Sequence, residues 1–382
     1  MKNYKVSVYA ICKNEEQNIL KWYDSMKEAD EIIVLDTGST DNTIKLIKKN
    51  CPKIKLFQDR ITPWRFDVAR NKSLALVPED TDICVCTDID ETFNTGWKKS
   101  LIENWQNDTT RGSYLYNWSF DSYNKPGTTF YLNKIHKREG YKWKYPVHEI
   151  LTYEGSEKEI IIPNVVLNHH PLAKESRKDY LPLLEQSLKE NKEDDRNAHY
   201  LGREYMYYEM WDKAIETLHY HLTLKSATWK DERCASMRFI ARSYYHKGYL
   251  EEAIMWYQKA IAEASYLREP YTELGYLYYY EKNYLESIKY LKKALKIKEK
   301  PKTYINEESA WNETIYDVLS ICYYNTHDYK KSLLNVKKAL KINPLNTRLQ
   351  KNYEIIKKAV WDYQKKKYPF YSLDISFLLF LI

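Results

Sequence analysis

Short apolar runs alternate with amphipathic segments over the first 90 residues of the chain. The apolar runs are Lys5–Cys12, Glu31–Leu35, Ile54–Phe57 and Ile83–Cys86. Near-continuous apolar runs are typical of buried parallel strands. The intervening segments, such as Ile19–Ala29, carry the apolar spacing of helices. This alternation predicts an α/β domain with a Rossmann-like, mostly parallel sheet built from right-handed βαβ units.

Acidic residues follow three of these predicted strands. Glu15 comes after the first strand, Asp36 ends the second, and Asp88 and Asp90 follow the fourth. Ligands of open α/β sheets bind at the carboxyl ends of the strands. Two carboxylates separated by one residue can hold a divalent cation, because Mg²⁺ usually takes one or two protein carboxylates plus phosphate oxygens and water. The pattern indicates an enzyme that handles a nucleotide diphosphate through a metal ion, with Arg70 joining the same crevice.

Each of these residues also has a purely structural interpretation. Glu15 and Asp41 could cap helices, and Arg70 could be a surface residue of its predicted helix. A single Asp-x-Asp also arises by chance in surface loops. The joint placement of acids at successive strand ends is what favours the functional interpretation.

The next segment has a different pattern. Strand-like stretches at 113–118 and 129–135 flank the turn residues Asn124–Gly127, which predicts a hairpin. Basic and aromatic residues alternate from Lys134 to Glu149. That alternation suits stacking on sugar rings and neutralising phosphate, or else an amphipathic edge hairpin.

An apolar stretch from Val165 to Leu167 leads into His169 and His170. A neutral imidazole at the end of a strand can complete the coordination of a metal held by Asp90. Paired histidines before Pro171 are equally compatible with a simple turn.

From Ser176 onward the strand signals stop and an internal repeat appears. In each of four copies a small residue is followed three positions later by Tyr, twelve positions later by a small residue, and nineteen positions later by a fourth marked position. These sets begin at Gly202, Ala241, Gly275 and Ser320, and only the first breaks the rule, with His221 at an alanine position. The pattern resembles the tetratricopeptide repeat, a helical hairpin of about 34 residues. Extra residues at Lys298–Glu308 predict a loop that projects from the solenoid.

Four motifs of the N-terminal part together resemble the family 2 glycosyltransferases of the nucleotide-diphospho-sugar transferase (GT-A) fold, over roughly residues 5 to 170. They are Lys5–Glu16, Asp36–Asp41, Phe66–Asn71 and Asp88–Glu91. The resemblance implies a nucleotide-diphospho-sugar donor and a divalent cation, Mn²⁺ or Mg²⁺.

The resemblance also implies roles for individual residues. Ile11 and Lys13 would lie beside the base, with Glu15 counted among the donor-binding residues. Asp36 would bond the uracil edge, and Arg70 would reach the base or the diphosphate. Asp88 would contact the ribose or the metal, Asp90 would bind the metal, and His169 matches the late histidine found near the metal in several members.

An inverting sugar transfer needs a carboxylate that removes the proton of the acceptor group. The Glu-Asp pair that often supplies this base in the family is absent from the second half of the domain. The segment Val147–Glu149 resembles its counterpart in relatives of lipopolysaccharide-core glucosyltransferases and peptide S-glycosyltransferases. This makes Glu149 the predicted base, with Glu139 as the alternative, while His148 either orients it or packs.

Composition narrows the setting of the protein. The 382 residues carry a net charge of +7 that is spread along the chain, and no basic-aromatic run or motif indicates nucleic-acid binding. Six cysteines are scattered without zinc-type spacing, which indicates a reducing, cytoplasmic compartment. No stretch reaches the roughly 20 apolar residues of a membrane span, although the basic and apolar C-terminal tail could touch the inner membrane or dock on the last repeat.

Together these patterns predict three parts: a GT-A glycosyltransferase domain over residues 1–175, tetratricopeptide-like repeats over 176–364, and a tail over 365–382. The predicted activity is metal-dependent inverting transfer from a UDP-sugar to an acceptor hydroxyl or thiol on a protein, peptide, lipid-linked sugar or polysaccharide. The repeats would bind acceptor or partner, or pair two copies of the chain. The alternative is a repeat scaffold whose glycosyltransferase-like domain is inactive.

Overall fold

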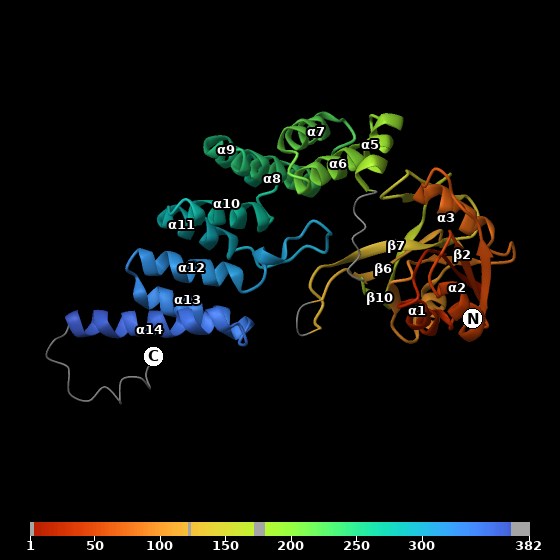
Figure 1. The fold of residues 1–382 in the computed structure, drawn as a ribbon, viewed down its shortest axis with the longest axis horizontal. Coiled ribbons are helices and arrows are strands. Elements are labelled where there is room, and N and C mark those ends of the chain that lie inside the picture. Colours follow the sequence, from red (N-terminus) through yellow and green to blue (C-terminus); the bar gives the residue numbers. More distant parts are fainter. Residues whose placement is uncertain (1–3, 121–123, 172–179, 368–382) are drawn as a thin grey trace. The chain divides into compact units, whose positions relative to one another are not determined.

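The computed structural model describes residues 4–120, 124–171 and 180–367. The chain forms two compact units, one of residues 1–227 with 302–304, and one of residues 228–301 with 305–382 (Figure 1). The predicted tail lies outside the described residues from Tyr368 onward. The two units are defined by contacts within the fold and do not test the three parts predicted from the sequence. That division therefore stays a prediction.

The first unit contains an eight-stranded sheet in the order β3-β2-β1-β4-β7-β6-β10-β5. Its strands are β1 (Val6–Cys12), β2 (Glu31–Asp36), β3 (Ile54–Gln58), β4 (Ile83–Cys86), β5 (Glu91–Phe93), β6 (Arg111–Asn117), β7 (Thr129–Lys137) and β10 (Glu159–His169), and a separate pair is formed by β8 (Tyr141–Lys144) and β9 (Ile150–Tyr153). Strands β1 to β4 run parallel, whereas β7 is antiparallel to both β4 and β6. The predicted Rossmann-like sheet and the predicted hairpin are both confirmed.

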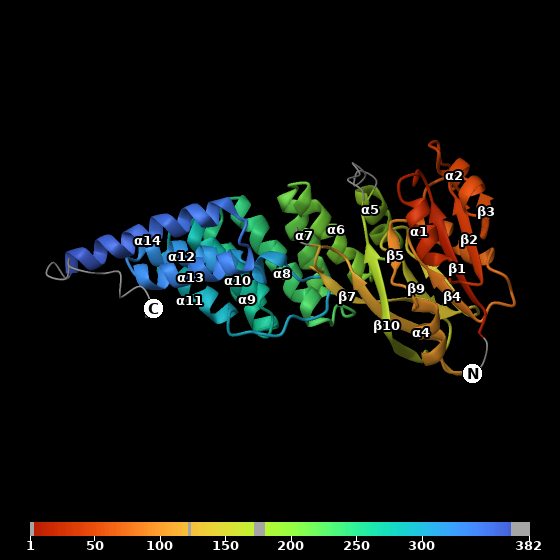
Figure 2. The ribbon, with the colours of Figure 1, turned by 90° about the horizontal axis from the view of Figure 1, so that it is seen from below.

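The helices of this unit follow the strands in the predicted alternation and then continue as a helical run. They are α1 (Ile19–Met26), α2 (Thr43–Asn50), α3 (Phe66–Ala75), α4 (Trp97–Asn104), α5 (Tyr180–Glu190), α6 (Asp195–Tyr207) and α7 (Trp211–Thr223). Figure 2 shows α4 beside the long strand β10.

Both faces of the central strands β1, β2 and β4 are buried, which explains their unbroken apolar runs. Val8 of β1 and Val85 of β4 lie in the core that includes Trp22 of α1. Tyr9 and Cys86, one position along each strand, lie in a second core. A strand covered on both sides needs apolar residues at every position, so it loses the alternation of a half-exposed strand.

A polar chain crosses the second core. The indole Nε1 of Trp143 donates to the Tyr9 hydroxyl at 2.9 Å, and that hydroxyl lies 2.9 Å from Nε2 of His136. His136 Nδ1 donates to the carbonyl of Lys137 at 2.7 Å. Since Nδ1 carries the proton, Nε2 accepts from Tyr9, and the chain is satisfied with a neutral imidazole.

His136 should make the first unit sensitive to mild acid. Burial lowers the pKa of His136 to about 3 from an ordinary value of 6.5. Below pH 6.5 the unfolded chain therefore binds a proton that the native state does not, and stability falls by about 1.4 kcal/mol per pH unit down to pH 3. We expect His136→Asn to remove roughly 2–3 kcal/mol of the stability difference between pH 6.5 and pH 4.5, measured by urea denaturation at both pH values. An unchanged difference would show that His136 is protonated in the native state as readily as in the unfolded one.

The second unit is helical among its described residues. It contains α8 (Lys230–His246), α9 (Leu250–Glu263), α10 (Glu269–Tyr280), α11 (Tyr284–Ala294), the short 3₁₀ helix η2 (Glu308–Ala310), α12 (Thr314–Asn325), α13 (Tyr329–Ile342) and α14 (Thr347–Lys367). None of the described helices of the chain combines the length and the apolar character needed to cross a bilayer.

The small residues of the repeat mark the closest helix contacts. A Cβ added at Gly275 of α10 would lie 2.6 Å from Leu291 of α11, and one added at Gly202 of α6 would lie 2.5 Å from Leu218 of α7. Only glycine permits these approaches. The small residues of the repeat pattern therefore mark positions where the two helices of a hairpin pack closely, and at Gly202 and Gly275 the packing leaves no room for a side chain.

The loop predicted at Lys298–Glu308 is present, because no helix or strand lies between the end of α11 at Ala294 and η2, and its projection from the helices stays a prediction. Its C-terminal end is fixed. Glu307 accepts hydrogen bonds from Arg238 and Arg242 of α8, so this end of the insertion is held against the helices. Sequence inspection could not find this, because the ion pairs join residues 65 and 69 positions apart.

Candidate active site

A line of alternating charges lies where β4 ends. Arg70 of α3 donates through Nη2 to Asp88 Oδ1 at 2.7 Å and through Nε to Glu149 Oε1. Lys134 of β7 donates to the other Asp88 oxygen at 3.2 Å. The four side chains thus follow one another in the order Glu149, Arg70, Asp88 and Lys134, and we call them the charged line. The side chain of Arg70 is only 4% exposed.

Arg70 is held by more than its ion pairs. Its guanidinium lies 5.1 Å from the centre of the Trp143 ring, and Nη1 is 3.3 Å from Cys86 Sγ. These contacts fix the guanidinium between the strand end and the loop that carries Glu149. Arg70 therefore positions both carboxylates rather than lying free on a helix surface.

The neighbouring charges shift the pKa values of Asp88 and Lys134 in opposite directions. Burial would raise the pKa of Asp88, but Arg70 and Lys134 lower it well below its ordinary value. Burial would lower the pKa of Lys134, but Asp88 and Glu91 raise it. At neutral pH Asp88 and Lys134 are therefore both charged, and both Asp88 oxygens already have cationic partners.

Asp90 faces a different partner. His169, the last residue of β10, has Nε2 3.4 Å from Asp90 Oδ2. Its Nδ1 donates to the carbonyl of Trp118 at 3.1 Å, and the two rings stack at 4.5 Å. A histidine that donates one ring N–H to a carbonyl has its other nitrogen oriented as a metal ligand, and the oxygen and nitrogen donors of this pair suit a divalent cation such as Mn²⁺. The backbone N–H of His170 donates to the carbonyl of Asp90 at 2.7 Å, but its ring has a different partner, with Nε2 3.1 Å from Thr92 Oγ1.

The loop before Glu149 has an unusual backbone. Tyr145 has φ 81° and His148 has φ 49°, a region that costs non-glycine residues about 1–3 kcal/mol and clusters at functional sites. The His148 ring stacks on Tyr200 at 3.9 Å, which favours the packing interpretation of His148.

Strand register separates the two candidate bases. Val85 pairs with Ile135 and Ile83 with Lys137. Glu139, which follows Lys137, therefore lies beyond the start of β4 and is exposed. Glu149 contacts Arg70 at the end of β4, so the geometry favours Glu149.

The other predicted donor-binding residues lie on the same edge of the sheet. Strand β1 pairs Cys12 with Asp36 of β2 and Tyr9 with Cys86 of β4. Asp36 therefore ends, and Asp88 follows, the two parallel strands on either side of β1. The Asp36 carboxylate is engaged within its own turn. It accepts from the backbone N–H groups of Gly38 and Ser39, each at 3.0 Å, and from the Ser39 hydroxyl.

The turn after β1 completes this edge. Ile11 is half-buried in β1 and Lys13 is exposed beyond its end. Glu15 is 9% exposed and accepts from the side-chain amide of Asn18 at 3.0 Å, which places it at the start of α1. The roles of these residues toward a nucleotide stay predictions.

Sequence reasoning missed two members of the site. Lys134 was seen only as the start of a basic-aromatic stretch, and Glu91 only as the end of a motif. Glu91 is buried and accepts the Asp88 backbone N–H at 2.8 Å, and burial together with the Asp88 charge raises its pKa. The available signal is a lysine that follows Phe130 and Leu132 on one face of a strand, but it gains meaning only once β7 is paired with β4.

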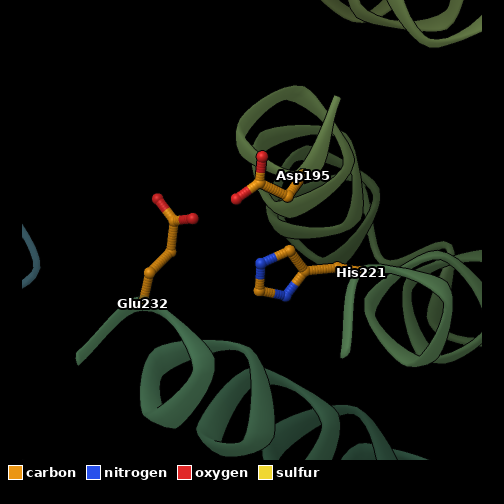
Figure 3. Close-up of side chains that lie close together, drawn as sticks. All are labelled: Asp195, His221 and Glu232. Atoms are coloured by element: carbon orange, nitrogen blue, oxygen red, sulfur yellow. The ribbon is translucent and has the colours of Figure 1, made fainter. Parts of the chain in front are cut away.

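A further acid and imidazole lie in the helical part. Figure 3 shows the Asp195 carboxylate of α6 and the His221 imidazole of α7 pointing toward each other, and it also labels Glu232 of the second unit. These residues come from helices and are not among the predicted metal ligands, which follow or end strands of the sheet.

The fold and the site define an α/β domain with acidic strand ends, joined to helical hairpin repeats. Residues 7–154 match the family model described as Glycosyl transferase family 2. Residues 239–265 and 269–301 match the Tetratricopeptide repeat model. The chain is therefore similar to family 2 glycosyltransferases over residues 7–154, and to tetratricopeptide repeats in its helical part.

A curated relative supports the first assignment. The chain is similar to the lipopolysaccharide core biosynthesis glycosyltransferase LpsC of Rhizobium meliloti (strain 1021), with 31% identity over 98 residues. The match covers 26% of this chain and 36% of the relative, so the chain spans about a third of that protein's length. The family match and this relative support glycosyl transfer as the chemistry of the domain.

Solved structures with similar folds include MamA, at 18% identity and a TM-score of 0.36, covering 44% of this chain and 89% of MamA. A thermophilic TPR protein of Thermus thermophilus is similar at 21% identity and a TM-score of 0.34, covering 46% of this chain and 88% of that one. At these scores no functional conclusion follows from either structure.

Proposed function

We propose that the protein is a metal-dependent inverting glycosyltransferase that moves a sugar from a UDP-sugar to an acceptor hydroxyl or thiol. The observation that carries the proposal is the charged line at the end of β4. It joins a buried Arg70 to the predicted base Glu149 and to Asp88. Asp90 follows Asp88 by two residues in the same turn and faces His169 of β10. This edge of the sheet is where open α/β folds bind nucleotides.

The contacts of each residue support a separate role in binding the donor or the metal. Arg70 and Lys134 each donate to a different oxygen of Asp88, which holds the carboxylate rigid, and its remaining lone pairs would accept from ribose hydroxyls. Asp90 and His169 would hold the Mn²⁺ or Mg²⁺, and a bound cation would neutralise charge on the departing nucleoside diphosphate. Lys134, whose positive charge lies against Asp88, would add to that neutralisation.

Glu149 is the residue proposed to take the acceptor proton. The Arg70 guanidinium lies between Glu149 and Asp88 and donates to both. The loop that carries Glu149 has a strained backbone. In an inverting reaction the base lies on the acceptor side of the sugar, opposite the leaving group. Arg70 between Glu149 and Asp88 keeps the two carboxylates at a set separation, so each can serve one side.

Glu149→Gln should lower kcat by about 10²–10⁴-fold, the usual contribution of general-base catalysis, with little change in donor affinity. The amide keeps the size of the side chain and cannot take a proton. Turnover would be followed by release of UDP, and donor affinity by calorimetry. Glu139→Gln is the matched control and should retain wild-type turnover; the reverse ranking of the two variants would move the base to Glu139.

The donor can be identified without knowing the acceptor. A panel of UDP- and GDP-sugars, scored by slow hydrolysis to the free nucleoside diphosphate, should single out one UDP-sugar. Calorimetry that finds no Mn²⁺-dependent binding of any sugar nucleotide would instead support a repeat scaffold with an inactive domain. The proposal leaves the repeats to bind the acceptor or a partner, or to pair two chains.

A further inference from the structure

A pocket lies in the second unit and is lined by residues of α9, α10 and α11 and of the turns that follow α9 and α11. Its volume is about 430 Å³, within the range of about 300–1,000 Å³ that is usual for small-molecule sites. The lining residues all fall between Gln258 and Ile297, so one unit alone forms the pocket. No residue of the charged line and no proposed metal ligand is among them.

The wall of the pocket is mostly apolar and includes two aromatic rings. Four of its residues have an apolar side-chain body: Ile261, Ile297, Tyr271 and Tyr290. The Tyr290 ring is held in place, because it stacks on Tyr278 with centroids 5.6 Å apart and the residue is 9% exposed. A fixed aromatic ring beside aliphatic side chains is a surface on which a flat ring of a ligand can pack.

Two lysines, Lys293 and Lys296, are the charged residues among those that line the pocket. Lys293 Nζ lies 5.1 Å from the centre of the Tyr290 ring, so a cation lies directly beside the aromatic wall. Both lysines are exposed, and neither has a carboxylate partner in the part of the chain that the structure describes. An anion at this edge of the pocket would therefore meet two ammonium groups that no side chain neutralises.

Acidic side chains of the helices around the pocket are bound to other cations. Glu263 of α9 accepts from Arg233 at 2.7 Å, and Glu286 of α11 pairs with Lys289 at 2.8 Å. Burial raises the pKa of Tyr271, and no neighbouring carboxylate contributes to that rise. The positive charge of the pocket is therefore not balanced by the described residues that surround it.

A few neutral polar groups complete the lining. Ser265 and Gln258 contribute a hydroxyl and an amide, which can donate as well as accept. The hydroxyl of Tyr271 has no hydrogen-bond partner among the described residues. An apolar wall with a small number of polar groups and a charged edge is the usual composition of a site that binds and orients a small molecule.

We propose that this pocket binds a small organic phosphate that carries an aromatic ring, such as a nucleoside monophosphate. The ring packs against Tyr290 and the two isoleucines of the wall, and the phosphate lies between the ammonium groups of Lys293 and Lys296. The site is independent of the proposed glycosyl transfer, because it lies in the helical unit and its contacts require neither a metal ion nor a sugar.

The test is binding of a fluorescent N-methylanthraniloyl derivative of AMP to the full chain, followed by anisotropy in the presence of EDTA. The double substitution Lys293→Gln and Lys296→Gln should weaken binding about tenfold or more, because two charge-assisted contacts to the phosphate are lost. Lys292→Gln is the matched control, since Lys292 lies in the same last turn of α11 but does not line the pocket. It should bind the probe as wild type does.

Competition separates the two halves of the ligand. Unlabelled AMP should displace the probe, whereas adenosine or inorganic phosphate at the same concentration should not, because each makes only part of the contacts. Displacement by phosphate alone would reduce the pocket to a simple anion site, and displacement by adenosine alone would leave the lysines without a role; either result overturns the proposal. So would the absence of saturable binding, equal binding by wild type and the double lysine variant, or loss of binding in Asp90→Asn, which would place the probe in the candidate active site.

Discussion

Asp90→Asn is expected to lower glycosyl transfer by about 10³-fold or more, since loss of a metal ion costs several kcal/mol of transition-state stabilisation. Asn keeps the shape of the side chain but loses the charge that would hold a divalent cation beside His169. The measurement is UDP release at saturating donor, with Mn²⁺ titrated from zero. The Mn²⁺ concentration for half-maximal activity should rise sharply, together with the Kd for Mn²⁺ measured by calorimetry.

Asp59→Asn provides a matched control for this substitution. Asp59 also follows a strand of the sheet, β3, but it pairs with Lys72 on the surface. It should behave as wild type in both activity and Mn²⁺ affinity. Full activity of Asp90→Asn, or wild-type activity in metal-free buffer, would remove the metal from the proposal.

Arg70→Met should lower the free energy of unfolding of the first unit by about 3–5 kcal/mol, the cost of removing one partner of a buried ion pair. The substitution keeps an apolar stem but leaves Asp88 and Glu149 without their shared cation. Lys134 would still serve Asp88, whereas Glu149, whose side chain is 10% exposed, would lose its charge partner. Urea denaturation followed by tryptophan fluorescence measures the change, since Trp143 packs on this guanidinium.

Arg65→Met is the control, because Arg65 precedes the same helix and pairs with Asp67 and Glu190 nearer the surface. Its cost should stay within about 1 kcal/mol. Adding Glu149→Gln to Arg70→Met should recover part of the lost stability by removing the stranded charge. Equal effects of the two arginine substitutions would mean that the charged line contributes little to folding.

The parts of the molecule that could be predicted from the sequence are those whose cause is local. The run at Ile83–Cys86 is apolar because both its faces are buried, and Asp88 and Asp90 lie at its end because the chain leaves the sheet there. The repeat is visible because a small residue recurs where paired helices approach closely, and at Gly202 and Gly275 the approach leaves no room for a Cβ.

What could not be predicted depends on pairing between distant segments. The contact of Arg70 with Glu149 joins residues 79 positions apart, and that of Lys134 with Asp88 depends on the register of β7 against β4. A carboxylate or a cation has the same appearance in the sequence whether it is buried in an ion pair or lies in solvent. Strand order, and not residue type, decided which of them met.

The position of β10 in the sheet has a consequence for biosynthesis. Strand β5, which directly follows Asp90, lies at the edge of the sheet and pairs with β10, the last strand of the domain. While the ribosome has not yet released residues 159–169, β5 has no neighbour and Asp90 has no imidazole facing it. The nascent domain thus brings Asp90 and His169, the proposed metal ligands, together only when its final strand inserts between β6 and β5, and a recombinant fragment ending at residue 154 would lack His169.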